Sequence, residues 1–276
     1  MIIDAHQHFW QLNRNDYGWL TPELGQIYRD FLPDDLAPHL NQHSIDGTIL
    51  VQAAPTLAET EFLLKVAEET PFVLGVVGWV DFASTLASDD IARLAEHPKL
   101  VGLRPMIQDI ADDDWMLRPD LEPAFQAMIR HDLTFDALVL PRHLLRLRQL
   151  LLRYPSLRTA IDHGAKPDIA GGEFDSWANN IATIARDTGA YCKLSGLLTE
   201  AGEGWEALDV APYAAHLFAE FGADRLVWGS DWPVVNLASN YKDWIDLAAT
   251  FVPDDTASGA VFGANALDIY GLSGRK

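Results

Sequence analysis

Eight short runs rich in β-branched residues alternate with longer stretches of helical periodicity along this 276-residue chain. This alternation predicts parallel strands joined by covering helices. Eight strands favour a closed (β/α)₈ TIM barrel over an open sheet, and such a barrel needs roughly 250 residues. We expect strands at Ile2–His8, Thr48–Ala53, Phe72–Val80, Val101–Ile107, Thr134–Leu140, Thr159–His163, Tyr191–Gly196 and Leu226–Ser230. We expect helices at Leu57–Glu69, Thr85–Glu96, Leu121–His131, Arg142–Arg153, Phe174–Thr188, Val210–Phe221 and Tyr241–Phe251, and an extra C-terminal helix at Asp255–Tyr270.

A doubly wound open sheet is the alternative fold for the same alternation. Its first strand would lead into a glycine-rich phosphate loop. Here the first strand leads into His6-Gln7-His8-Phe9-Trp10, which contains no glycine. No linker or low-complexity segment divides the chain, so we expect one barrel domain over residues 1–276.

The segment Phe9–Leu36 follows the first expected strand and has no repetitive pattern. It contains Trp10, Tyr17, Trp19 and Tyr28. Long irregular loops are usually functional or disordered, and this aromatic content argues against disorder. We therefore expect a lid over the mouth of the barrel, with Trp19 as a substrate-binding candidate.

The charge balance narrows the range of partners. Twenty basic against forty acidic residues give a formal charge of −20, which repels nucleic acids and anionic membranes. No apolar run is long enough to span a bilayer, and the N-terminus lacks the pattern of a signal peptide. The single cysteine, Cys192, fits a buried residue of a cytoplasmic protein. A homo-oligomer is compatible with these features.

Titratable residues are concentrated at the expected carboxyl ends of the strands, where barrel enzymes place their active sites. His6 and His8 are two residues apart, so on a strand both point the same way. Two converging imidazoles are typical of a site beside a metal or an anionic centre. Hydrogen-bonded structural histidines would be the alternative.

Two further residues fall at strand ends near this pair. His163 ends the sixth expected strand, and Asp231 follows the eighth. Because the last strand of a closed barrel lies beside the first, Asp231 should stand close to His6 and His8. A carboxylate there can ligate a metal or act as a general base on water. A turn residue before a proline is its structural alternative.

Arg104 ends the fourth expected strand, where a guanidinium favours binding of a carbonyl or carboxylate. An ion pair with Asp136 is an equally weighted structural role. Lys166, just after His163, could bind a substrate oxygen. Weaker strand-end candidates, of which the first two are assigned to substrate binding, are Gln52, Trp79, Asp136, Lys193 and Ser195. Surface or packing roles are expected for the remaining histidines, His39, His43, His97, His131, His143 and His216.

Taken together, these segments resemble the amidohydrolase superfamily, of the amidohydrolase 2 type, and within it the sugar-lactonase branch. The resemblance spans essentially the whole chain and implies the same barrel. It rests on these segments in order: Ile3-Asp4-Ala5-His6-Gln7-His8-Phe9-Trp10, Gly102-Leu103-Arg104-Pro105, Asp162-His163-Gly164-Ala165-Lys166-Pro167, Lys193-Leu194-Ser195-Gly196-Leu197, Gly229-Ser230-Asp231-Trp232-Pro233 and Asn265-Ala266.

The resemblance implies catalytic or metal-ligating positions at His6, His8, His163 and Asp231. Arg104 matches an arginine that contacts the scissile carbonyl or a substrate carboxylate. Binuclear relatives carry a bridging Lys or Glu and a further His on strands four or five, and this chain has Arg104 and Asp136 there. One Zn²⁺ ion and a metal-free site are both compatible with this departure.

The implied reaction is hydrolysis of a sugar-acid lactone, of the L-fucono- or L-rhamnono-lactone type, to the open aldonate by base-activated water. The alternatives are a pyrone-dicarboxylate-type lactonase, a metal-dependent decarboxylase on the same barrel, and a barrel that only binds sugar acids. Few strand-end cations favour a neutral lactone over a dicarboxylate. The candidate base Asp231 with three histidines argues against a purely binding role.

Overall fold

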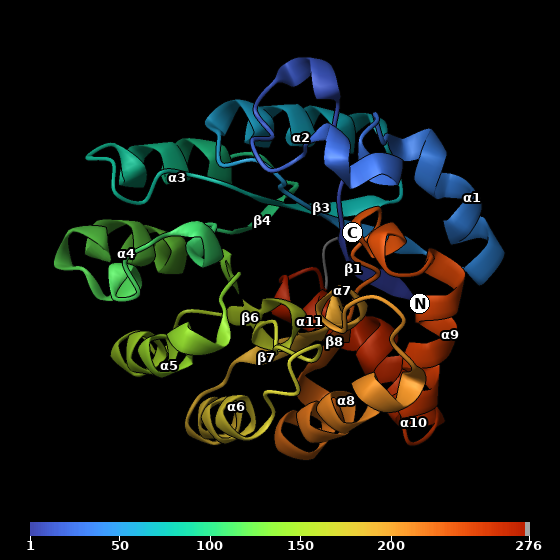
Figure 1. Cartoon of the computed structure of the whole chain (residues 1–276). Helices are drawn as coiled ribbons and strands as arrows, with labels where there is room; N and C mark the ends of the chain where they lie inside the picture. Colours follow the sequence, from blue (N-terminus) through green and yellow to red (C-terminus); the bar gives the residue numbers. More distant parts are fainter. Residues whose placement is uncertain (274–276) are drawn as a thin grey trace.

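The computed structural model describes residues 1–273, which form eight parallel strands surrounded by helices (Figure 1). Each strand pairs with the next in chain order, from β1 to β8. Every strand predicted from the sequence is present. Their bounds are β1 Ile3–Gln7, β2 Gly47–Val51, β3 Val73–Gly78, β4 Leu100–Leu103, β5 Thr134–Ala137, β6 Thr159–Ile161, β7 Tyr191–Leu194 and β8 Leu226–Trp228.

The first and last strands close the barrel through the segments that follow them. The His8 amide donates to the Trp232 carbonyl at 2.7 Å, and the Asp231 amide donates to the His6 carbonyl at 2.8 Å. Gln7 and Trp232 form a parallel bridge at the same place. The predicted (β/α)₈ barrel is confirmed, and its closure brings Asp231 beside His6 and His8.

Apolar side chains fill both faces of the sheet. One buried cluster lies inside the barrel, contributed by alternate strand residues, and α11 (Asn265–Ile269) closes it. The larger cluster lies between the sheet and the helices and also takes in the aromatic N-terminal segment. Representative inner residues are Ile3, Ile49, Val77, Val101, Val227 and Ile269. Continuous burial on both faces is what an all-parallel sheet requires.

The helices form the outer ring of the barrel (Figure 1). All seven helices predicted for this ring, six between strands and one after β8, are found, with ends that differ from the prediction by at most a few residues. Their bounds are α2 Leu57–Glu69, α3 Ala87–Ala95, α4 Glu122–Arg130, α5 Leu144–Arg153, α6 Asp175–Asp187, α8 Ala207–Phe221 and α9 Tyr241–Phe251.

Among the described residues, two α-helices had no counterpart in the prediction. The first, α1 (Pro33–His43), buries only Leu36 and Leu40 and contains Pro38, so it lacks a recognisable apolar stripe. The second, α7 (Leu197–Glu200), is a single turn. The predicted C-terminal helix is found as α10 (Asp255–Gly259) and α11, joined by a π-helical turn at 260–264.

The aromatic segment after β1 is packed onto the barrel. Trp10 is fully buried and makes edge contacts with Phe31 and Trp19, at ring-centroid distances of 5.5 Å each. Tyr17 is also buried, whereas Trp19 remains 36% exposed. Aromatic burial therefore orders this segment. Within residues 1–273, no helix combines the length and hydropathy needed to cross a membrane.

Candidate active site

A bulge in β1 turns His6 into the barrel. The pairing of β1 with β2 shifts by one residue between Asp4 and Gln7. Asp4 faces outward, where it accepts hydrogen bonds from the Ser230 amide and the Tyr241 hydroxyl. His6, two residues on, contacts Lys193 inside the barrel. Strict alternation would have placed both side chains on one face, so the bulge re-aims the histidine.

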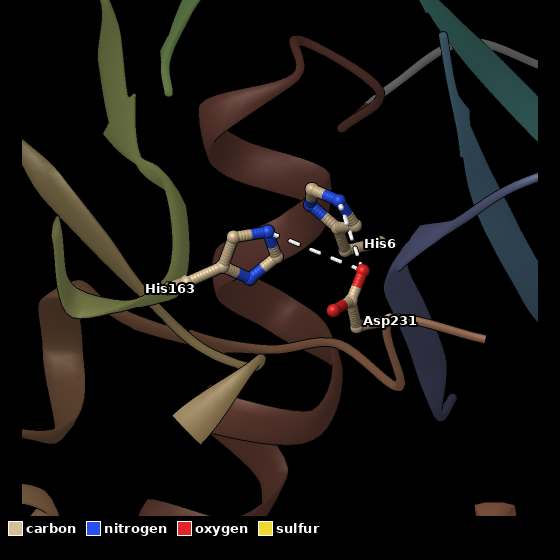
Figure 2. Close-up of side chains that lie close together, drawn as sticks. All are labelled: His6, His163 and Asp231. Atoms are coloured by element: carbon tan, nitrogen blue, oxygen red, sulfur yellow. Dashed lines mark ion pairs between the residues drawn. The ribbon is translucent and has the colours of Figure 1, made fainter. Parts of the chain in front are cut away.

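His6, His163 and Asp231 converge at the carboxyl ends of three strands, with both rings directed at the Asp231 carboxylate (Figure 2). Asp231 Oδ1 lies 3.7 Å from His6 Nε2 and 4.0 Å from His163 Nε2. It lies 3.3 Å from His8 Nε2, and the His6 and His8 Nε2 atoms are 3.2 Å apart. The structure thus brings together the four residues of the predicted cluster.

The backbone at two of these residues is left-handed. His163 has a φ of 54° and Asp231 a φ of 57°, values uncommon outside glycine and enriched at functional sites. Two glycines leave room for the rings. A Cβ on Gly229 would lie 2.6 Å from His6 Cβ, and one on Gly196 would collide with the His163 ring. Local backbone geometry and close glycine approaches together aim the histidines.

Hydrogen bonds orient the first two histidines. His8 Nδ1 lies 2.8 Å from the Val51 carbonyl and donates to it. His6 Nδ1 lies 3.0 Å from Lys193 Nζ, and His6 Nε2 lies 3.4 Å from Arg104 Nη1, so a cationic donor faces each nitrogen of the His6 ring. These two fixed positive charges favour the neutral form of His6.

Burial and neighbouring charge shift the pKa values of these groups. Burial raises the pKa of Asp231, but His163, His8 and His6 outweigh burial and hold it well below its usual range. Burial lowers the pKa of His163 to about 4. Burial and the Lys193 charge lower the pKa of His6 well below its usual value. At neutral pH the site therefore holds an ionised Asp231 beside neutral His6 and His163.

Under the histidines lies a fully buried ion network centred on Lys193. Its Nζ lies 2.5 Å from Asp136 Oδ2 and 2.8 Å from Asp162 Oδ1, in addition to its contact with His6. The Tyr270 hydroxyl donates to Asp136 at 2.9 Å. The ammonium thus hydrogen-bonds Asp136 and His6 and forms an ion pair with Asp162. This network fixes the orientation of His6 from below.

Arg104 pairs with Asp162, at 3.2 Å, and the suggested pairing with Asp136 is wrong because Lys193 occupies that carboxylate. Nη1 of Arg104 also lies 3.4 Å from His6 Nε2. Its Nη2 donates to the Gln52 carbonyl, and Gln52 Nε2 donates back to the Arg104 carbonyl at 2.7 Å. Gln52 is therefore buried behind the arginine and does not line the cavity above it.

A cavity of about 400 Å³ opens above this cluster, which we call the mouth cavity. His8, Arg104, His163 and Asp231 line it, as do Trp19 and Lys166. Lys166 is held at 3.2 Å from Glu200 and donates to Gln108 at 3.1 Å. Trp79 lines a neighbouring cavity and not this one.

Two buried carboxylates of this region were not singled out by the sequence. Asp162 anchors both Lys193 and Arg104, and Asp4 joins β1 to the segment after β8. Each interrupts an otherwise apolar strand run, which is the signal that could have found them. Ser195, a weaker candidate, lies 2.8 Å from His163 Nδ1.

The cluster could hold a metal ion. Ligand atoms of His6, His163 and Asp231 all lie within 4.8 Å of one another. A tetrahedral Zn²⁺ with bonds of about 2.0–2.1 Å separates its ligand atoms by about 3.4 Å. The separations of 3.2–3.7 Å among His6, His8 and Asp231 are close to this value. The donor set therefore fits one small divalent ion.

Glu59, in α2, shapes the loop that follows β2 at the cavity wall. Its carboxylate accepts from the Ala53 amide at 3.0 Å and from the Ala54 amide at 2.6 Å. The Ala53 carbonyl in turn accepts from the Trp19 indole at 2.7 Å. Burial raises the pKa of Glu59 from 4.5 to about 8, against these backbone hydrogen bonds.

This shift predicts a pH-dependent stability that Glu59→Gln removes. The folded chain keeps the Glu59 proton at pH values where the unfolded chain has lost it. The stabilisation is therefore complete below about pH 4.5 and is lost as the pH rises through about 8. Urea unfolding should show that the free energy of unfolding falls more between pH 5 and pH 9 for wild type than for Glu59→Gln. Exposed Glu61→Gln is the control, and equal losses in wild type and Glu59→Gln would contradict the prediction.

Comparisons with known proteins find relatives over nearly the whole chain. A family model described as amidohydrolase matches residues 3–272. An L-fucono-1,5-lactonase from Burkholderia ambifaria is 49% identical over 274 residues, 97% of this chain and 94% of that protein. A second, from Burkholderia multivorans, is 33% identical over 98% of this chain and 96% of that protein. A crystal structure of a Burkholderia multivorans amidohydrolase with bound zinc has a TM-score of 0.92 at 31% identity, covering 98% of this chain and 99% of that one.

Proposed function

This chain belongs to the amidohydrolase family, and from that membership we propose that it is a lactonase that opens L-fucono-1,5-lactone to L-fuconate. The choice of substrate rests on 49% identity, over nearly the whole chain, to a protein of that activity. The site supports the chemistry, because an ionised carboxylate, two imidazoles and a guanidinium line one cavity, with the buried His6 ring 3.7 Å from the carboxylate.

In the proposed first step, Asp231 removes a proton from a water molecule as the oxygen of that water attacks the lactone carbonyl. The low pKa of Asp231 makes it a weak base, so stabilisation of the developing oxyanion must supply much of the rate. Arg104 and Lys166 are the positive charges in the cavity wall, and Arg104 is the one that contacts the histidine cluster. His6, whose Nε2 lies 3.4 Å from Arg104 Nη1, holds the guanidinium from below.

In the second step, the tetrahedral intermediate collapses and its bond to the ring oxygen breaks. Protonated Asp231 returns its proton to the departing alkoxide, which becomes the hydroxyl group of the aldonate. The same carboxylate thus serves as base and then as acid, and it ends the cycle ionised. A divalent ion at the cluster, when bound, would polarise the carbonyl and acidify water.

The walls of the mouth cavity suit a small neutral sugar lactone. Trp19 offers an aromatic face to the apolar side of the ring, and its indole N–H is already held by Ala53. Each of the two cations in the wall already has a carboxylate partner. Lys166 is paired with Glu200 at 3.2 Å, and Arg104 is paired with Asp162. This charge balance offers little to a dicarboxylate.

A substrate comparison tests the proposed function. We expect rapid acid release from L-fucono-1,5-lactone, followed with a pH indicator and corrected for spontaneous hydrolysis. Under the same conditions 2-pyrone-4,6-dicarboxylate should be hydrolysed at least 100-fold more slowly, about 2.7 kcal/mol in transition-state free energy. If the enzyme released carbon dioxide from 2,6-dihydroxybenzoate and released no acid from any lactone, the proposed lactonase function would be wrong. The enzyme would then be a decarboxylase.

We propose that the cluster binds at most one divalent ion, with Zn²⁺ as the first candidate. A second ion would need further carboxylates, and the nearest ones, Asp136 and Asp162, are held by Lys193. Titration with Zn²⁺ should therefore saturate at one ion per chain, measured by calorimetry and elemental analysis. His163→Ala should weaken binding at least tenfold. A stoichiometry of two, or binding unchanged in His163→Ala, would contradict this assignment.

A further inference from the structure

Beside the mouth cavity lies a second hollow of about 620 Å³, which we call the side cavity. Its wall carries three tryptophans and three carboxylates. These residues are Trp19, Trp79, Trp115, Asp16, Asp81 and Asp109. Among the lining residues that the structure describes none is basic, so the hollow is unsuited to an anion.

The two cavities are adjacent. Trp19, Met106 and Asp109 line both of them. A substituent on a ring held over Asp231 that passes these three residues would enter the side cavity. The mouth cavity alone has room for one sugar ring, and the side cavity is the larger of the two.

Packing and backbone hydrogen bonds hold the aromatic walls of the side cavity in place. The Trp79 amide donates to the Thr60 hydroxyl at 2.8 Å, and that hydroxyl donates to the Trp79 carbonyl at 2.9 Å. Trp115 packs against Phe82 with ring centroids 6.3 Å apart. The indole N–H of Trp19 donates to the Ala53 carbonyl. These surfaces are therefore formed before a ligand arrives, which lowers the entropic cost of binding.

The polar groups of the wall complement hydroxyl donors. Asp16 lies on the wall of the side cavity, and its Oδ2 accepts from Arg14 and Thr56. Asp81 and Asp109 are exposed at the rim. Flat aromatic faces beside acceptor oxygens suit the C–H faces and hydroxyls of a sugar ring.

We propose that the side cavity binds a second, neutral sugar ring attached to the lactone ring, so that the enzyme accepts a glycosylated aldonolactone. This inference rests on the proposed lactonase function and extends its substrate class from a monosaccharide to a disaccharide lactone. The reacting ring lies over Asp231, and its substituent passes Met106 to reach Trp79 and Trp115.

Two lactones that differ only in the second ring test the proposal. One is L-fucono-1,5-lactone, and the other is the same lactone with a glucosyl group on O3 or on O4. We expect kcat/KM to be about tenfold higher for one of the glycosylated lactones, and Trp79→Ala to abolish this advantage. The ratio of the two kcat/KM values does not depend on the fraction of folded enzyme, so partial unfolding of a variant does not mimic the result.

The matched control is Tyr28→Ala, a partly exposed aromatic residue that lines neither cavity. It should leave the ratio at the wild-type value. Normal turnover of the plain lactone, with both glycosylated lactones slower or the ratio unchanged in Trp79→Ala, would overturn the second-ring site alone. No turnover of the plain lactone would instead overturn the proposed function. Saturable binding of tetramethylammonium that Trp79→Ala removes would reassign the cavity to a cationic ligand.

Discussion

Asp231→Asn is expected to lower kcat for L-fucono-1,5-lactone by about 10³-fold, within the range of 10²–10⁴ that general acid–base catalysis contributes. The amide is nearly isosteric with the carboxylate but cannot take up a proton from water. Asp231 is the ionised group that faces both the cavity and the three histidines. KM should change far less than kcat, because the proton transfer belongs to the transition state.

The measurement is steady-state hydrolysis by purified protein, with thermal unfolding recorded for each variant. Exposed Asp120→Asn, which removes only the surface partner of Arg118, is the matched control for loss of one carboxylate. It should retain wild-type kcat. Turnover of Asp231→Asn within tenfold of wild type would show that another group is the base.

Lys193→Met is expected to destabilise the fold by about 3–5 kcal/mol, the usual cost of removing one partner from a buried ion network. Methionine matches the length of the lysine stem but leaves Asp136 without its cation and Asp162 with Arg104 alone. Each orphaned carboxylate would then be fully buried. His6 would also lose its hydrogen bond to the ammonium.

Urea unfolding of Lys193→Met should be compared with that of the double variant Lys193→Met/Asp136→Asn. The second change removes the orphaned charge while its amide oxygen still accepts from Tyr270, so part of the lost stability should return. The control Lys242→Met, which breaks an exposed ion pair with Asp246, should lower the free energy of unfolding by less than about 1 kcal/mol. A Lys193→Met cost as small as that of Lys242→Met would mean that the network does not stabilise the fold.

Much of the fold was predictable because it depends on periodicity. When short apolar strands alternate with amphipathic helices, few folds can bury both faces of the resulting parallel sheet. All eight strands lie where the pattern predicted them. The missed helix α1 shows the limit of this signal. The helix buries only Leu36 and Leu40, so packing against the barrel stabilises it more than its own sequence pattern predicts.

The convergence of His6, His8, His163 and Asp231 was also predictable, although their roles stay proposals. Each follows a strand, and a closed parallel barrel gathers all strand ends on one face. The positions of individual side chains relative to the cavities were harder to predict from the sequence. Gln52 and Trp79 both end strands, yet Gln52 is buried against Arg104 and Trp79 lines the side cavity.

The sequence by itself therefore determined the barrel, the face that carries the site and the identity of its polar residues, because these follow from strand period and chain order. Only the tertiary structure decided the direction and the partner of each group. The β1 bulge turned His6 inward, and Lys193 reached it from a strand nearly 190 residues away. Such contacts depend on the register and on three-dimensional distances between strands, which no local pattern of residues encodes.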